Sequence, residues 1–268
     1  MDAQRSSPLN SRSVVFDSFD ADVVSQALDD ALQYAVLSKP FTVNRMRLSI
    51  DRSLINIAKG KLVEYLFREA CREKGIVLEV DRCTTPFWKR DLRDFVLHNR
   101  EWDVKSLFLH QLPPKSAFDE CPALIPNRFP GDQWSTRASR YLPDLTDPPA
   151  SVFVFLSTLN LSLELDRDQS TFVADMCREF GEREALSEPF KSDWYLDHFP
   201  RFNELSTKID SMPVMAITGV ASQFEWGKFS SVPAKTFHVD GVRVFTTRIP
   251  NMWCRAGDLT PFADIVGW

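Results

Sequence analysis

Two acidic residues and a lysine with the spacing of an active site occur in the segment 93–109, RDFVLHNREWDVKSLFL. Side chains two positions apart in a strand lie on the same face, so Asp103 and Lys105 would point the same way. A tight turn at His98-Asn99-Arg100 would place Asp94 on the neighbouring strand, near Lys105. Two carboxylates and one ammonium group would then converge on one patch of a sheet.

Such a patch suits a hard metal ion. Adjacent carboxylates repel each other unless they are protonated or bind a cation. Mg²⁺ is usually held by one or two carboxylates together with waters and phosphate oxygens. A bound ion would lower the pKa of its water and polarise a phosphate group. Lys105 would orient the attacking water or stabilise charge on the phosphate oxygens.

A third acid can come from a preceding helix. Glu64, in KGKLVEYLF, flanks the apolar stripe of residues 54–74. Gly60 lies one turn earlier on the same side and leaves space for a close neighbour. Glu64 would join the site directly or through a water molecule; the alternative is a solvated position on the side of the helix.

This order of elements resembles the PD-(D/E)xK nuclease superfamily, which has the restriction-endonuclease-like fold. The resemblance covers about residues 55–109, with a weaker similarity in the strand at 151–159. It implies that Asp94 and Asp103 bind Mg²⁺, that Lys105 assists the hydrolytic water and that Glu64 is an auxiliary acid. Arg93 replaces the proline of the motif, which leaves Asp91 as a competitor of Asp94. Asp94 is preferred because residues 95–97 continue directly as a strand.

The remaining pattern predicts one α/β domain, a restriction-endonuclease-like mixed β-sheet flanked by helices, over residues 1–268. We expect residues 1–43 to be a helical N-terminal extension, ended by Lys39-Pro40, and residues 44–160 to be the catalytic core. Helices are predicted at 14–38, 54–74 (with Gly75 as C-cap) and 168–180. Strands are predicted at 76–80, 94–97, 101–109, 151–159 and 214–221. A Pro-rich irregular stretch is expected at 112–150, and a hairpin at 235–249 that turns at Asp240-Gly241.

Composition narrows the functional classes. The net charge of −5 does not by itself indicate a nucleic-acid binder, although DNA contact depends on local basic surface. The five cysteines are scattered, and no signal-peptide or membrane-spanning pattern is present, so we expect a cytoplasmic protein. No phosphate-binding glycine motif and no G-x-S-x-G occurs, which argues against nucleotide-driven and serine-hydrolase functions.

Basic residues near the motif are candidates for DNA contact. They are Lys89 and Arg90 before the motif, Arg128, Arg137 and Arg140 in the Pro-rich stretch and, as weaker candidates, Arg243, Arg248 and Arg255 near the C-terminal hairpin. The alternative is that these residues only keep surface loops soluble.

The sequence therefore predicts a Mg²⁺-dependent endonuclease that cleaves double-stranded DNA, as a type II restriction enzyme or a related defence enzyme. Cutting both strands of a palindrome would favour a homodimer. A structure-selective repair nuclease, an RNA nuclease and a non-catalytic DNA-binding or interaction module are the alternatives.

Overall fold

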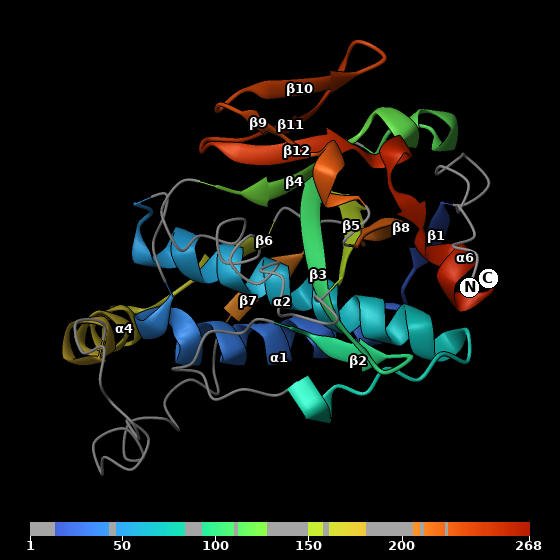
Figure 1. Ribbon diagram of the computed structural model, residues 1–268. Helices are drawn as coiled ribbons and strands as arrows, with labels where there is room; N and C mark the ends of the chain where they lie inside the picture. The colour runs from blue at the N-terminus through green and yellow to red at the C-terminus, as the bar shows by residue number, and fades with distance from the viewer. Residues whose placement is uncertain are drawn as a thin grey trace, which may run out of the picture.

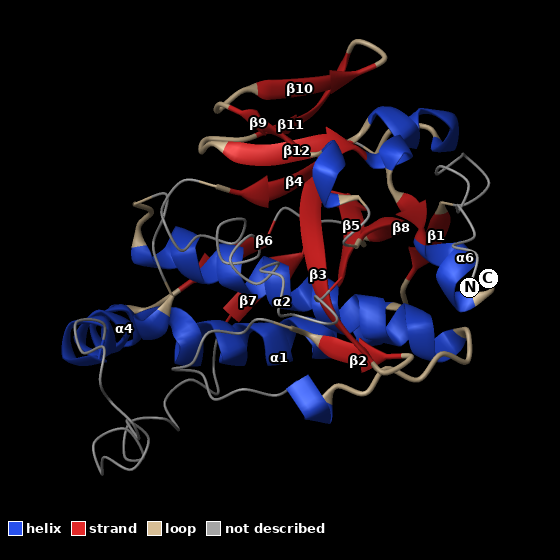
Figure 2. Ribbon diagram, in the orientation of Figure 1, coloured by secondary structure: helices blue, strands red, loops and turns tan. Residues whose placement is uncertain are grey.

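A computed structural model describes residues 14–42, 47–83, 93–109, 112–127, 150–157, 161–180, 206–209, 212–222 and 225–268. The protein has a mixed α/β fold with a curled mixed sheet at its centre. Helices lie against one face of this sheet, and a second group of strands lies toward the other (Figures 1 and 2).

The six-stranded central sheet carries the predicted motif. Its strand order is β1-β8-β5-β3-β2, and β13 pairs with β8 in addition. The bounds are β1 Val15–Ser18, β2 Phe95–Leu97, β3 Arg100–Leu109, β5 Ala150–Ser157, β8 Val214–Ala221 and β13 Thr260–Pro261. Strands β3 and β5 are parallel, and the other pairs are antiparallel. The predicted strands at 94–97, 101–109, 151–159 and 214–221 are thus confirmed to within a few residues.

Two long helices cover one face of the sheet. They are α1 (Ala21–Ser38) and α2 (Ile50–Glu73). The predicted row Leu54, Ala58, Leu62, Leu66 and Ala70 is fully buried on α2, because these residues recur once per turn. Gly75 has a φ of +77° just after the helix, as the C-cap prediction requires.

Two predictions near these helices are wrong in detail. Residues 15–18 were expected to be helical but form β1, because they pair with β8 from Val15↔Ile217 to Ser18↔Val214. The predicted strand at 76–80 is reduced to one bridge, Glu79↔Val96. For residues 15–18, pairing with β8, some 200 residues away in the chain, outweighs the local helical pattern. The neighbouring residues in the sequence give no sign of this distant partner.

The second group of strands packs beyond the central sheet. A three-stranded sheet has the order β4-β12-β9, and a ribbon pairs β10 with β11. The bounds are β4 Pro122–Pro126, β9 Ser230–Val232, β10 Thr236–Val239, β11 Val242–Thr246 and β12 Asn251–Arg255. The predicted hairpin is confirmed: Asp240 and Gly241 both have positive φ. The stretch 112–150 is not wholly irregular, since Lys115–Glu120 forms a 3-10 helix and the buried residues of β4 pair with β12.

The remaining elements carry none of the motif residues. They are β6 (Leu161–Glu164), β7 (Ser206–Ile209), α4 (Arg167–Phe180), α6 (Phe262–Val266) and short 3-10 turns at Lys39–Phe41, Asp81–Cys83, Trp226–Lys228 and Ala256–Asp258. Helix α4 agrees with the prediction for 168–180. All five cysteines are free thiols. Across the described ranges, no helix is long and apolar enough to cross a membrane.

Candidate active site

The acid and the lysine of the D-x-K motif form an ion pair on β3. Lys105 Nζ lies 2.8 Å from Oδ1 and 2.6 Å from Oδ2 of Asp103, so the ammonium group bridges both carboxylate oxygens. Both side chains are only about a tenth exposed. Ser151 of β5, the register partner of Asp103, places its Oγ 3.4 Å from Asp103 Oδ2. The sequence thus places three polar groups side by side on two parallel strands.

Alternation along β3 explains why the pair is held in place. Trp102 and Val104 belong to the hydrophobic cluster under α1 and α2. Trp102 stacks on Phe95 of β2, with the ring planes 4° apart, and its Nε1 donates to Leu97 O at 3.1 Å. These contacts anchor one face of β3, and Asp103 and Lys105 therefore lie on the opposite face.

Asp94 lies at the start of the adjacent strand, where the β2–β3 pairing ends. Its backbone N–H donates to Trp102 O at 2.7 Å, and its Oδ2 accepts the backbone N–H of Val104 at 2.5 Å. The Asp94 carboxylate thus accepts the hydrogen bond from Val104 N–H that a backbone carbonyl of a longer β2 would accept. The two-residue turn that makes this possible has positive φ at both His98 and Asn99.

A second lysine adds to the charge balance at this site. Lys61 of α2 forms a short ion pair with Glu64 and lies 4.5 Å from the centroid of the Tyr34 ring. Burial by itself lowers the pKa of Lys61, but the negative charges of Glu64 and Asp94 outweigh it, so the pKa lies above its usual value. Lys61 is therefore the electrostatic link between the helix and Asp94.

Lys61 was not identified from the sequence. Its only local signal is its position three residues before Glu64, which is a common spacing for surface ion pairs. The field of Asp94 reaches it only because α2 packs on the sheet. Glu64 itself is partly buried on α2, and it accepts a hydrogen bond from Lys61. A Cβ atom at Gly60 would meet no atom within 4 Å, which agrees with the expected space on that side of the helix.

The carboxylates fit a magnesium ion only with water or substrate as further ligands. Within the described part of the chain, no three side chains of His, Cys, Asp or Glu gather closely enough to enclose a metal. Asp94 Oδ1 makes no hydrogen bond to any described residue, and Asp94 Oδ2 accepts the backbone N–H of Val104. Asp103 would have to share its oxygens with Lys105. One or two carboxylates are the usual protein contribution to a Mg²⁺ site, so the donor set is compatible with this ion.

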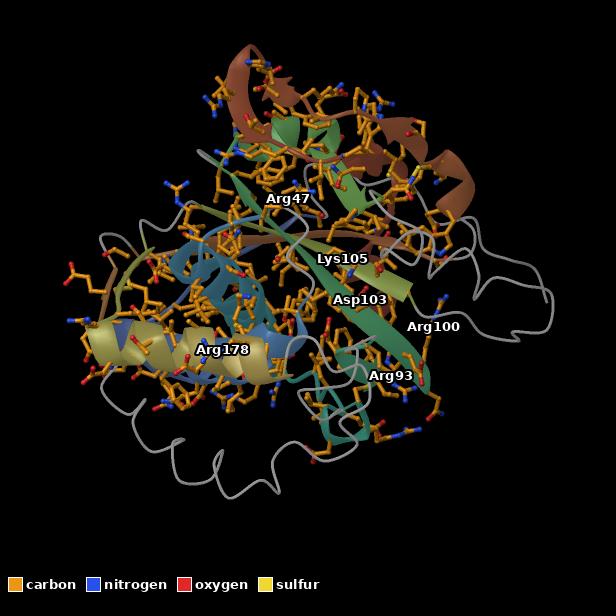
Figure 3. All side chains as sticks on the ribbon, turned by 90° about the vertical axis from the view of Figure 1, so that its left-hand side faces the viewer. Arg47, Arg93, Arg100, Asp103, Lys105 and Arg178 are labelled. Carbon is orange, nitrogen blue, oxygen red and sulfur yellow. The ribbon has the colours of Figure 1, made fainter. Side chains whose placement is uncertain are left out.

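Two arginines lie toward the turn of the same hairpin. Arg93 forms a short ion pair with Glu101, and Arg100 lies 5.8 Å from the Trp102 ring centroid. Figure 3 shows Asp103 and Lys105 along β3, with Arg93 and Arg100 farther toward the β2–β3 turn. The predicted DNA contacts Lys89, Arg90, Arg128, Arg137 and Arg140 lie outside the described residues, as does Asp91.

Comparisons of the chain with known protein families, with curated proteins and with solved structures find no match.

Proposed function

We propose that this protein is a Mg²⁺-dependent endonuclease that hydrolyses phosphodiester bonds of double-stranded DNA, with a restriction-endonuclease-like fold and a role as a type II restriction or related defence enzyme. The observation that supports it most is the Asp103–Lys105 pair on β3, with the Asp94 carboxylate against the adjoining peptide. The order α2, β2, β3 and then β5 parallel to β3 supports the fold assignment.

Each polar residue has a distinct role in this proposal. Asp94 and Asp103 would hold the Mg²⁺ ion, which supplies a Lewis acid when bound. The Ser151 hydroxyl orients Asp103. Lys105, already fixed on Asp103, orients the attacking water or stabilises the negative charge that grows on the phosphate oxygens. Lys61 reduces the repulsion between Glu64 and Asp94.

The test is cleavage of mixed unmodified duplex DNAs with Mg²⁺ or with EDTA. We expect discrete fragments with Mg²⁺ only, and a rate lower by about 10²–10³-fold in Lys105→Ala, the usual effect of removing one charge-stabilising donor. Because Lys105→Ala removes the positive charge beside the buried Asp103 carboxylate, Asp103→Asn and the double variant are tested beside it, with thermal unfolding as a check of the fold.

Lys74→Ala is the matched control. Lys74 also forms an ion pair with an aspartate, Asp17, but at the far end of α2. The Lys74→Ala variant should be less stable than the wild type but should cleave DNA at the wild-type rate. Cleavage that survives in both Lys105→Ala and Asp103→Asn would refute the assignment of the site. Cleavage of branched DNA or of RNA instead of linear duplexes would favour a repair or RNA nuclease, and intact substrates throughout would favour a non-catalytic binding module.

Cleavage of both strands of a palindrome requires two active sites related by a two-fold axis. The restriction-enzyme form of the proposal therefore expects a homodimer on DNA, measured by sedimentation with an uncleaved duplex in EDTA.

A further inference from the structure

The β10–β11 ribbon and its flanks are basic in an otherwise acidic chain. Residues 226–256 contain five Lys or Arg and one acid, Asp240, a net charge of +4, whereas the whole chain has −5. The ribbon lies at the outer edge of the molecule, beyond β12 and β4 (Figure 1). A local positive surface of this kind attracts polyanions regardless of the net charge of the whole chain.

The ribbon has one buried face and one polar face. Phe237, Val239 and Val244 are buried beneath it. His238 and Arg243 are exposed and directly opposite each other across the two strands. The side chains on the outer face are therefore cationic or polar, and the inner face fixes the ribbon to the rest of the protein.

Several cations of this surface are not neutralised by neighbouring acids. Arg243 and Arg248 are exposed and form no ion pair or side-chain hydrogen bond with other described residues. Lys235 lies over the rings of Phe237 and Trp253, at 4.6 and 5.2 Å from their centroids. Arg255, by contrast, is paired with Asp258 and Glu120. The unpaired charges belong to the ribbon and to the turn that follows it.

The ribbon and the candidate active site lie on the same side of the central sheet. Asp103, Lys105, Leu107 and Leu109 alternate onto one face of β3. Leu107 and Leu109 belong to the same hydrophobic cluster as the buried face of the ribbon.

We infer that His238 and Arg243 on the outer face of the β10–β11 ribbon, together with Arg248 in the turn that follows it, bind the phosphate backbone of duplex DNA. This inference rests on the proposed function, because it names a surface that would bind the DNA substrate. A two-stranded ribbon can also enter the major groove. The cationic side chains bind phosphates irrespective of sequence, which gives affinity and orientation.

The test is the salt dependence of binding of the full chain to a fluorescent duplex in EDTA, where no cleavage intervenes. Each phosphate contact contributes a slope of about −0.9 in log affinity against log salt concentration. Arg243→Gln with Arg248→Gln should therefore reduce the slope by about 1.8 and weaken binding roughly 60-fold at 0.1 M salt. The loss should be equal for duplexes of unrelated sequence.

The matched control removes two positive charges elsewhere. Arg72 and Arg178 are exposed on α2 and α4 and are paired with Glu69 and Asp175. Arg72→Gln with Arg178→Gln should leave the salt slope unchanged, although it alters the net charge equally. Thermal unfolding of both double variants should match the wild type, because all four side chains lie on the surface.

The outcomes separate this inference from the proposed function. An unchanged salt slope in the ribbon variant, or no duplex binding by the wild type, overturns the inference. If the ribbon variant binds duplex DNA as tightly as the wild type and still cleaves it with Mg²⁺, the proposed nuclease activity is supported and the proposed DNA-binding surface is refuted. Ribbon-dependent binding with no cleavage under any condition would sustain the surface and refute the nuclease.

Discussion

The two lysines at the candidate site act on different acids. Lys105 bridges both oxygens of Asp103 on the strand, whereas Lys61 holds Glu64 on the helix and is influenced by Asp94. Each lysine side chain is at most about 15% exposed. Partly buried charges of this kind are tolerated only when they are paired, so removing one partner costs more than the pair contributes.

Replacing Lys61 with Met should destabilise the protein by about 1–3 kcal/mol, because the partly buried Glu64 carboxylate loses the charged hydrogen bond from Lys61. The double variant Lys61→Met with Glu64→Gln should recover most of this loss. The pKa of Lys61 is raised in the folded protein, so its contribution is fully present below the unfolded value of 10.5 and declines only at higher pH. Urea unfolding at pH 7 and pH 8 should therefore give the same difference between wild type and Lys61→Met.

At the scale of single elements, the sequence predicted those features that depend only on neighbouring residues in the chain. The α2 stripe, the turn at His98-Asn99 and the Asp240-Gly241 hairpin follow from spacing and backbone conformation alone. The pair Asp103–Lys105 was predictable for the same reason, since both belong to one strand. Ser151, Lys61 and β1 were not, because each depends on a partner brought close only by the folded sheet.

The end of β8 depends on one buried glutamate. Glu225 accepts hydrogen bonds from the backbone N–H and Oγ of Ser222, at 2.8 and 2.5 Å, and from Thr260 Oγ1 on β13 at 2.7 Å. Burial alone would raise the pKa of Glu225, but these hydrogen bonds and the charge of Lys228 outweigh it and lower the pKa. The carboxylate thus joins the end of β8 to β13.

Glu225→Ala should destabilise the protein by about 1–3 kcal/mol at neutral pH, because buried donors lose their acceptor. Since the folded pKa is depressed, this stabilisation is present above the ordinary value of 4.5 and is lost as the pH falls through the folded pKa. Unfolding curves should therefore converge for wild type and Glu225→Ala in acid. A constant difference from pH 7 down to pH 2 would contradict this account.

At the scale of the whole molecule, β1 and the C-terminal Trp268 both lie beside Lys74 at the end of α2. Strand β1 forms the edge of the sheet beside β8, and Phe16 contacts Phe118 with ring centroids 5.2 Å apart. Lys74 of α2 pairs with Asp17 and lies 5.4 Å from the Trp268 ring. The region before α1 is thus part of the sheet and contributes to its stability.

A chain that begins at Phe19 should be less stable than one that begins at Val14. The longer chain keeps β1, buried Val14 and the Asp17–Lys74 ion pair. We expect a loss of about 3 kcal/mol, or roughly 6–12 °C in Tm, on removing them. Calorimetry of the two truncated proteins measures the difference, and equal Tm values would show that β1 is dispensable.

The parallel pairing of β3 with β5 also determines when the candidate site is completed during folding. Asp94 and Asp103 are joined by a hairpin, and such hairpins form within about 1–10 μs. Ser151 is 48 residues from Asp103 in the chain and arrives only when the crossover between the strands has closed. The hairpin that joins the two aspartates thus depends on a local turn, whereas the contact of Ser151 with Asp103 depends on the long-range pairing of β3 with β5.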